Sequence, residues 1–328
     1  MTTADRAQDA IEWPTLLVLV ASYALWLTAT SIMYTWSPLL AIIITGMTVA
    51  QFSSLQHEAL HGHPFRAGWL NELLVLPSVT LTVPYGRFRD THLAHHHDPV
   101  LTDPYDDPES NYLEPAVWAK LPRAVQLVLL ANNTLLGRMV IGPLIGNALW
   151  LRSEARMLWR GERPVLRDWL LNTLGLIPVI AWLWMVAMPW WAYLIAAWIG
   201  HGILKIRTYL EHRAHDLCRA RSVIVEDRGP LALLFLNNNF HAVHHMHPQV
   251  AWYKLPALYA AQADHYQRRN EGYVYRSYVD IFRAFLFRVK DPVPHPLMPE
   301  VMPEQPPVQA ILRKVGTSPA LSKNGTPC

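Results

Sequence analysis

The sequence predicts an all-α integral membrane protein whose four transmembrane helices form two hairpins and carry a cytosolic helical cap. Three observations favour this fold class. Hydrophobic residues make up 52% of the 328 residues and charged residues only 16%, whereas about a quarter of a soluble domain is charged. Neither Lys nor Arg occurs between Arg6 and Arg66 or between Arg167 and Lys205. Most of the 16 histidines gather in short clusters near the ends of the apolar runs.

Each stretch without basic residues holds two apolar runs that are separated by a short uncharged turn. The expected spans are residues 14–33, 37–56, 169–188 and 190–204. The first three have close to the ~20 residues that cross a bilayer, and the helical pattern of the fourth continues toward His215. Buried helices of a soluble protein are the alternative, but four such runs without a basic residue disfavour it.

The basic residues predict the orientation of the spans. All 28 Lys and Arg residues fall on one side of this arrangement, and the positive-inside rule makes that side cytoplasmic. Residues 1–13 hold one Arg against two Asp and one Glu, which is a poor start for a secretory signal, so we expect the first run to be retained. The net charge of only +3 gives no electrostatic support for nucleic-acid binding.

The remaining segments are expected to lie outside the spans. Residues 70–84 are apolar but too short to span, which predicts an interfacial or re-entrant segment. Residues 125–150 are long enough but are interrupted by polar residues and Pro143, which favours interfacial helices. We expect one membrane domain at residues 1–290 and a disordered, Pro-rich tail at residues 291–328.

The histidines form four clusters, which are HEALHGH from His57, HLAHHHDP from His92, EHRAH from Glu211 and HAVHHMHP from His241. On a helix, HxxxH and HxxHH place their histidines on one face. All four clusters come from helix ends or loops on the same side of the membrane, so they can converge on one site. Eight or nine imidazoles exceed what one ion can take, whereas two ions use them well. Nitrogen ligands without any Cys favour redox iron over structural zinc.

The order HxxxH, HxxHH and HxxHH, interleaved with two hairpins, resembles the membrane fatty acid desaturase/hydroxylase superfamily over roughly residues 37–259. The stretches LTDPYDDPES and NNNFHAVHH…WYKLPALY are similar to a bacterial branch that includes desaturases, hydrocarbon oxygenases and rhizopine-catabolism oxygenases. The resemblance implies two Fe ions, O2 as oxidant and a lipid-like or other small-molecule substrate. It also implies a ferredoxin or similar electron donor with its reductase, and a bacterial inner membrane with the site on the cytoplasmic side.

Carried over to this sequence, the resemblance assigns nine metal ligands, with His215 as a rival to the ninth, His212. The ligands are His57, His61, His92, His95, His96, His212, His241, His244 and His245. Residues that could orient these ligands are Glu58, Asp98, Glu211, His215 and Asn238. Within the acidic run after the second box only Asp98 is expected to do so, while the rest is expected to be a solvated loop.

Several alternatives remain open at this stage. The default activity is an acyl desaturase, but a hydroxylase of an alkyl, carotenoid or smaller substrate would use the same ligands. His57, Glu58 and His61 also match the HExxH motif of zinc metalloproteases, in which the two HxxHH boxes would have no role. A histidine-rich transporter would place its ligands within the spans, which hold only His201. That residue either lines a substrate channel or hydrogen-bonds a neighbouring helix.

Overall fold

The computed structural model of the chain describes residues 11–96 and 98–298. The first hairpin consists of α2 (Trp13–Thr28) and α4 (Pro38–Leu60). Between them, the helix continues through a π-helical turn, η1 (Ala29–Met33), and α3 (Tyr34–Trp36). Ser37 then adopts an extended conformation, and Pro38, whose fixed φ suits the first turn of a helix, starts α4.

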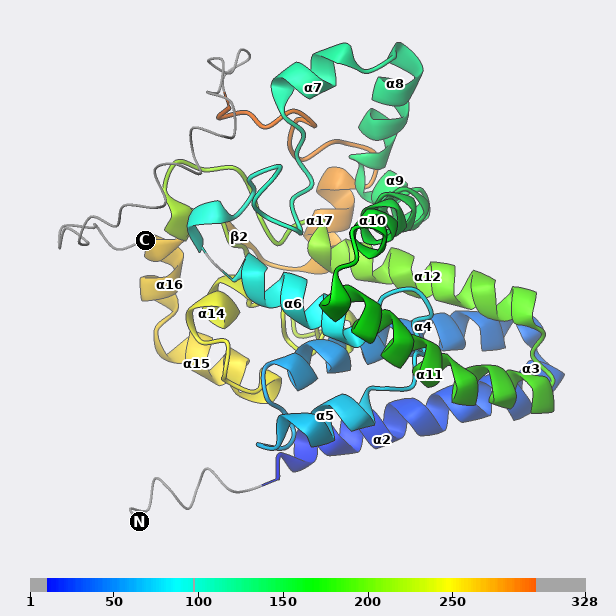
Figure 1. Cartoon of the computed structure of the whole chain (residues 1–328). Coiled ribbons are helices and arrows are strands. Elements are labelled where there is room, and N and C mark those ends of the chain that lie inside the picture. The colour runs from blue at the N-terminus through cyan, green and yellow to red at the C-terminus, as the bar shows by residue number, and fades with distance from the viewer. Residues whose placement is uncertain (1–10, 97, 299–328) are drawn as a thin grey trace.

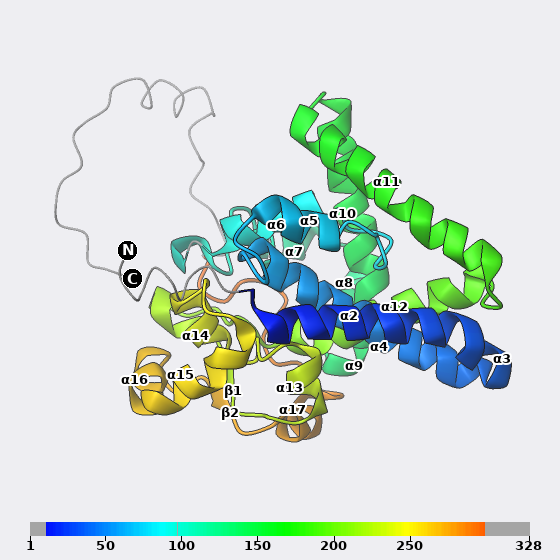
Figure 2. The ribbon, with the colours of Figure 1, turned by 90° about the horizontal axis from the view of Figure 1, so that it is seen from below.

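The second hairpin consists of α11 (Arg163–Met185) and α12 (Trp190–Thr208). Helix α12 packs along α4 at a pair of glycines, since a Cβ on Gly200 would lie 2.6 Å from the carbonyl oxygen of Gly46. Helix α11 instead diverges from the α2–α4 pair, and the N-terminal end of α11 is the end that lies away from them (Figure 2). Both hairpin turns lie at one end of the molecule, and the short helices gather at the other (Figure 1).

Three helices are long and apolar enough to cross a membrane, judged by length and composition, and these are Trp13–Trp36, Pro38–Leu60 and Arg163–Met185. On α11, apolar side chains at helical spacing are more than half exposed, as on a lipid-facing side: Leu166, Leu170, Leu174 and Ile177. Helix α12, which contains the expected span 190–204, is not among the three candidates. The four-span topology and the cytosolic side of the cap therefore stay predictions.

Short helices connect the two hairpins and complete the cap, with one small sheet among them. Strands β1 and β2 pair in parallel, with Ile224 opposite Val274. Before α11 the elements are α5 (Gly68–Leu74), α6 (Tyr85–His95), η2 (Asp98–Val100), α7 (Pro115–Lys120), α8 (Arg123–Asn132), α9 (Leu135–Val140) and α10 (Gly142–Trp159). After α12 they are η3 (Cys218–Ala220), β1 (Ile224–Val225), α13 (Pro230–Leu234), α14 (His241–Met246), η4 (Trp252–Lys254), α15 (Leu255–Ala261), α16 (Ala263–Arg269), β2 (Val274–Tyr275) and α17 (Tyr278–Phe285).

Residues 75–84 form an irregular segment that runs between the long helices. The Ser78 N–H donates to the carbonyl of Gly175 on α11 at 3.0 Å, and the Tyr193 hydroxyl on α12 donates to the carbonyl of Val79 at 2.7 Å. Nε2 of His201 lies 3.1 Å from the carbonyl oxygen of Thr80. Non-helical backbone is tolerated at membrane depth only where such neighbours satisfy its polar groups, so these contacts fit the expected re-entrant segment.

The packed structure extends past residue 290, where the sequence predicts the start of a disordered tail. Leu113 and Val293 share a backbone hydrogen bond of 2.9 Å, and the His295 N–H donates to Leu113 at 2.8 Å. The buried His295 ring also lies 3.2 Å from the hydroxyl of Thr102. The first residues of the predicted tail are therefore folded onto the loop before α7, and residues 299–328 lie outside the described part of the chain.

Candidate metal centre

The nine predicted histidines converge in two adjacent groups. In each group, every histidine offers a ring nitrogen within 4.8 Å of those of its partners. The five-histidine group consists of His57, His61, His92, His96 and His244, and the four-histidine group consists of His95, His212, His241 and His245. The two groups adjoin, because the rings of His96 and His245 stack with their centroids 4.4 Å apart.

Four elements deliver these side chains. The last turn of α4 carries His57 and ends at His61, the last turn of α6 carries His92 and His95, and α14 carries the third box. His212 follows the end of α12 and forms an isolated bridge with Ser222. Helix geometry explains why each HxxHH box contributes histidines to both groups. The first and last histidines of a box, at i and i+4, lie on one face of the helix. The histidine at i+3 is rotated from i by about 60° in the opposite direction and therefore points to the other group.

The ring nitrogens of different histidines point at one another. In the four-histidine group, Nε2 of His212 lies 2.8 Å from Nε2 of His95 and 3.0 Å from Nε2 of His241. In the five-histidine group, Nε2 of His96 lies 3.0 Å from Nε2 of His92 and 3.2 Å from Nε2 of His244. A neutral imidazole has one donor nitrogen and one acceptor nitrogen. Acceptor nitrogens that face one another call for a cation between them.

The opposite ring nitrogens are held by oxygen atoms. Nδ1 of His92 lies 2.9 Å from Oε1 of Glu109, and Nδ1 of His95 lies 2.7 Å from Oδ1 of Asp107. Nδ1 of His241 and His212 lie 3.1 Å from Asn238 Oδ1 and 3.2 Å from Ser222 Oγ. An oxygen acceptor at Nδ1 keeps the proton on that atom and turns the lone pair of Nε2 inward, as is usual for metal-bound histidines.

Three of the five residues expected to orient the ligands, Asn238, Glu211 and Glu58, lie beside a clustered histidine. Asn238 does contact a clustered histidine directly, as does Glu211 more loosely, with Oε1 3.6 Å from Nδ1 of His241 and 2.8 Å from Nε of Arg207. Glu58 lies 3.7 Å from Nδ1 of His57 and accepts a hydrogen bond from the Trp252 N–H. His215 belongs to neither group, and its Nδ1 accepts from the Leu217 N–H at 3.1 Å. The side chain of Asp98 lies outside the described part of the chain.

Sequence reasoning missed Asp107, Glu109 and Ser222. The two acidic residues lie in the run that was expected to be a solvated loop, and Asp107 is buried. Its Oδ2 accepts from the Thr102 N–H at 2.8 Å, and its Oδ1 accepts from the Glu109 N–H at 2.9 Å. Asp107 thus folds its own loop back onto the box. An acidic pair two residues apart, shortly after an HxxHH box, is the signal that could have identified them.

The pKa of His95 is raised, whereas the pKa values of several neighbouring histidines are lowered. Burial, followed by the charges of the surrounding histidines, lowers the pKa of His212, His241 and His244 well below the usual value and favours the neutral, ligating form. Burial alone would also lower the pKa of His95, but the carboxylates of Glu109 and Asp107 raise it to about 9. A metal ion that binds His95 therefore displaces a proton.

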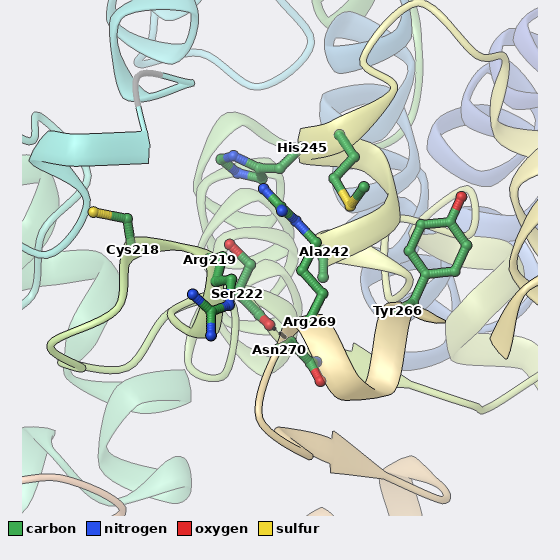
Figure 3. A pocket seen from close by; sticks show the side chains of 9 residues that line it. Cys218, Arg219, Ser222, Ala242, His245, Tyr266, Arg269 and Asn270 are labelled. Carbon is green, nitrogen blue, oxygen red and sulfur yellow. Dashed lines mark hydrogen bonds between the residues drawn. The ribbon is translucent and has the colours of Figure 1, made fainter. Parts of the chain in front are cut away.

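One side of the four-histidine group is reached from outside. His245 lines a small pocket together with residues of η3, α14 and α16 (Figure 3). Arg219 and Arg269 lie around it, and the side chain of Arg219 is 38% exposed even though it pairs with Glu271. His95 and His241 are thus buried, whereas His245 reaches a pocket whose lining includes two arginines.

The described residues fit a centre of two metal ions. The donors are all imidazole nitrogens, two groups adjoin, and buried ring nitrogens such as Nε2 of His57 and of His61 have no hydrogen-bond partner within the described residues. No curated protein matches the chain at a significant level. The family model for fatty acid desaturases matches residues 34–277, which are more than half of the chain and include all nine histidines. The chain therefore belongs to the fatty acid desaturase family of membrane-bound di-iron oxidoreductases.

Proposed function

We propose that the protein uses two iron ions and O2 to desaturate an unactivated C–H bond pair in a lipid-like acyl substrate. The division of the nine histidines into two adjoining groups carries this proposal, because each group has enough nitrogen donors for one iron. The five-histidine group would hold one ion and the four-histidine group the other. When bound, the ions would supply the oxidising power that removes hydrogen atoms from an unactivated carbon.

The protein would contribute position and the exclusion of water. Glu109, Asp107 and Asn238 fix the directions of three imidazoles, and the burial of His57, His92 and His244 keeps bulk water from the five-histidine group. Whether a C–H bond yields an alkene or an alcohol depends on substrate placement to within about an ångström. Conversion of –CH2–CH2– to –CH=CH– consumes one O2, two electrons and two protons and yields two water molecules, so an electron donor is required.

A ferredoxin or similar protein, with its reductase, is the proposed donor. The pocket at His245 supports this, because it brings the outer surface close to one of the two histidine groups and is flanked by Arg219 and Arg269. Basic residues at such a place complement an acidic partner and steer its approach. A bacterial inner membrane with the centre on the cytoplasmic side is the proposed location, supported by the long stretches without basic residues.

The zinc metalloprotease alternative fits the geometry poorly. A catalytic zinc ion keeps three protein ligands and an open position, whereas His57 and His61 lie in a group with three further histidines. Glu58, the base that such a mechanism needs, accepts a hydrogen bond from the Trp252 N–H. We therefore do not assign a proteolytic activity.

Metal analysis of the purified protein tests the proposal. We expect two iron ions per chain, and we expect His92→Ala and His212→Ala each to lower that content. His215→Ala and His265→Ala are matched controls that should keep it, since neither residue belongs to a histidine group. One zinc ion per chain, or iron loading that survives both ligand variants, would contradict the proposal.

Product analysis then tests the reaction itself. The protein is supplied with acyl lipids, reduced ferredoxin and O2, and the products are analysed by mass spectrometry. A loss of two mass units identifies the expected alkene. A gain of one oxygen atom would show a hydroxylase and replace the desaturase in the proposal.

A further inference from the structure

Two cations without a carboxylate partner lie where α9, α10 and α12 meet. Arg138 is 8% exposed, and within the described residues its guanidinium donates only to the side-chain oxygens of Asn111 and Asn133. Its Nε is buried without a partner among the described residues. Lys205 is half-buried, and within the described part of the chain its ammonium group has no ion pair within 4.0 Å. Neither positive charge therefore has a carboxylate within ion-pair distance among the described residues.

The two cations lie along one glycine face of α10, beside which Figures 1 and 2 place α9 and α12. A Cβ on Gly142 would lie 3.2 Å from Cδ of Arg138, and a Cβ on Gly146 would lie 4.0 Å from Nζ of Lys205. These glycines are one helical turn apart, so their Cβ positions are separated by about 6 Å. Gly142 lets α10 pack closely against the Arg138 side chain, and Gly146 leaves space beside the Lys205 ammonium group.

The surroundings of this pair are polar. Oδ1 of Asn132, beside Gly142, and the hydroxyl of Thr80, whose carbonyl contacts His201, are buried without hydrogen-bond partners among the described residues. His201, one turn before Lys205, contacts Asn147 of α10 at 3.3 Å. Unpartnered buried polar groups are costly, and together they suit a polar ligand or bound water. A channel for an acyl chain alone would be lined by apolar side chains.

The nearby carboxylates are already engaged. Glu211 pairs with Arg207 at 2.8 Å, and Glu109 lies 2.9 Å from Nδ1 of His92. A lysine at a membrane surface usually extends its ammonium group into water, but Nζ of Lys205 lies against the backbone face at Gly146. A buried or half-buried cation without an ion pair is unfavourable, so an anion bound beside Arg138 and Lys205 would stabilise both.

The cation pair lies close to the five-histidine group. Arg138 hydrogen-bonds Asn111, which is two residues from Glu109, the residue that holds His92. Two residues of extended chain span at most ~7 Å. Asn111 and Glu109 of one loop thus link Arg138 to His92 of the five-histidine group.

We propose that Arg138 and Lys205 bind an anionic group of the substrate, a carboxylate or a phosphate. The substrate is then a molecule whose charged end is inserted into the protein where α9, α10 and α12 meet. This inference rests on the proposed function for the statement that the bound molecule is the substrate. The anion site itself follows from the two cations and the glycine face.

Ligand binding to the purified full-length protein in detergent micelles tests the inference. The probes are octanoate, octyl phosphate and octanol, which share one alkyl chain and differ in the charged end, and the readout is the midpoint of thermal unfolding. We expect octanoate or octyl phosphate to raise the midpoint and octanol at equal concentration to leave it unchanged. The better of the two anions identifies the carboxylate or the phosphate as the preferred group.

Three variants localise the binding. Lys205→Met should weaken the apparent affinity for the anionic probe by about tenfold or more, the loss of one charge-assisted hydrogen bond, and Lys205→Arg should retain it. Lys120→Met, which removes an exposed lysine of α7, is the matched control and should bind as the unchanged protein does. Equal stabilisation by octanol and octanoate overturns the inference, and this comparison needs no variant to fold. Undiminished binding by a folded Lys205→Met protein overturns it as well.

Iron content measured on the same preparations separates the two proposals. Iron at two ions per chain without any preference for anionic probes would refute the anion site and leave the proposed reaction standing. A clear preference for anionic probes in a protein that binds no iron would refute the proposed reaction and keep the anion site.

Discussion

Asp107 and Glu109 lie two residues apart and hold the Nδ1 atoms of two histidines that belong to different groups. Carboxylates outside the boxes thus fix the directions of histidines within them. The histidines of the boxes could be predicted from the sequence, because three boxes at helical spacing in one chain are typical of a metal centre. The carboxylates could not, because an acidic loop is usually solvated and only the fold brings this one back onto α6.

Asp107→Asn should weaken iron binding without unfolding the protein. The amide keeps the size of the side chain but removes the negative charge that orients His95 and favours its interaction with a cation. Loss of such a partner typically lowers metal affinity by about 10- to 100-fold. Iron retention against a graded chelator measures the change, with the exposed Asp106→Asn as control. Equal retention by both variants would show that Asp107 only shapes the loop.

His212 and His215 also differ in where the structure places them. The sequence places both near the end of the last span, and the resemblance assigned His212 with His215 as its rival. The chain turns after Thr208, the end of α12, and this turn brings His212 beside His95 and His241 while His215 binds the backbone of its own loop. The choice depends on where a helix ends, which sequence patterns fix only to within a few residues.

At the scale of elements, the long helices follow the apolar runs, but their ends do not. Helix α11 begins at Arg163, before the predicted start at residue 169, because Pro164 suits the first helical turn and charged residues there remain outside the apolar run. The stretch 125–150 divides into α8, α9 and α10, with the Thr134 hydroxyl capping α9 by accepting from the Gly137 N–H. The path of residues 75–84 could not be predicted, since it depends on hydrogen bonds to residues about a hundred positions away.

Gly175→Ala should destabilise the contact between α11 and this irregular segment. A Cβ at that position would lie 2.0 Å from the carbonyl oxygen of Leu76 and 2.7 Å from the Ser78 hydroxyl, so backbone must move. We expect a loss of roughly 1–3 kcal/mol in the free energy of unfolding. Gly68→Ala is the control, because nothing lies within 4 Å of its added Cβ. Thermal unfolding of both variants in micelles measures the difference, and similar midpoints would argue against close packing at Gly175.

At the scale of the whole molecule, one carboxylate joins α6 to the consecutive helices α10 and α11, which lie far from it in the sequence. Both oxygens of Glu154 on α10 accept from Arg87 on α6, at 2.9 and 3.0 Å, and Oε2 also accepts from the indole N–H of Trp169 on α11 at 3.1 Å. Glu154 is 2% exposed. Because α6 carries the second box, this contact connects the position of three histidines to the helices of the middle region.

Glu154→Ala should therefore lower both stability and iron content. Removing one partner of a buried ion pair leaves the Arg87 charge uncompensated, which typically costs about 3–5 kcal/mol. Thermal unfolding and metal analysis of the variant measure the two effects, with the exposed Glu162→Ala as control. A stable Glu154→Ala protein that keeps its full iron content would show that α6 is positioned without this contact.

Removal of the metal should loosen the cap as a whole. The histidines come from α4, α6, α14 and the segment after α12, so bound ions connect parts of the chain that are far apart in sequence. A ligand that binds only the folded state stabilises it in proportion to the logarithm of its concentration over Kd. We expect the unfolding midpoint to fall after chelation and to recover when ferrous iron is restored. An unchanged midpoint would mean that packing alone holds the cap.

Each HxxHH box supplies histidines to both groups, since His92 and His96 lie in one and His95 in the other, while His244 lies apart from His241 and His245. Neither ion could then be gained or lost without disturbing the helices that serve the other. The first ion to bind orders α6 and α14, and the second meets ligands whose entropy has already been reduced. Loading should therefore be cooperative, so that a half-filled protein is scarce and iron titration follows a sigmoidal curve.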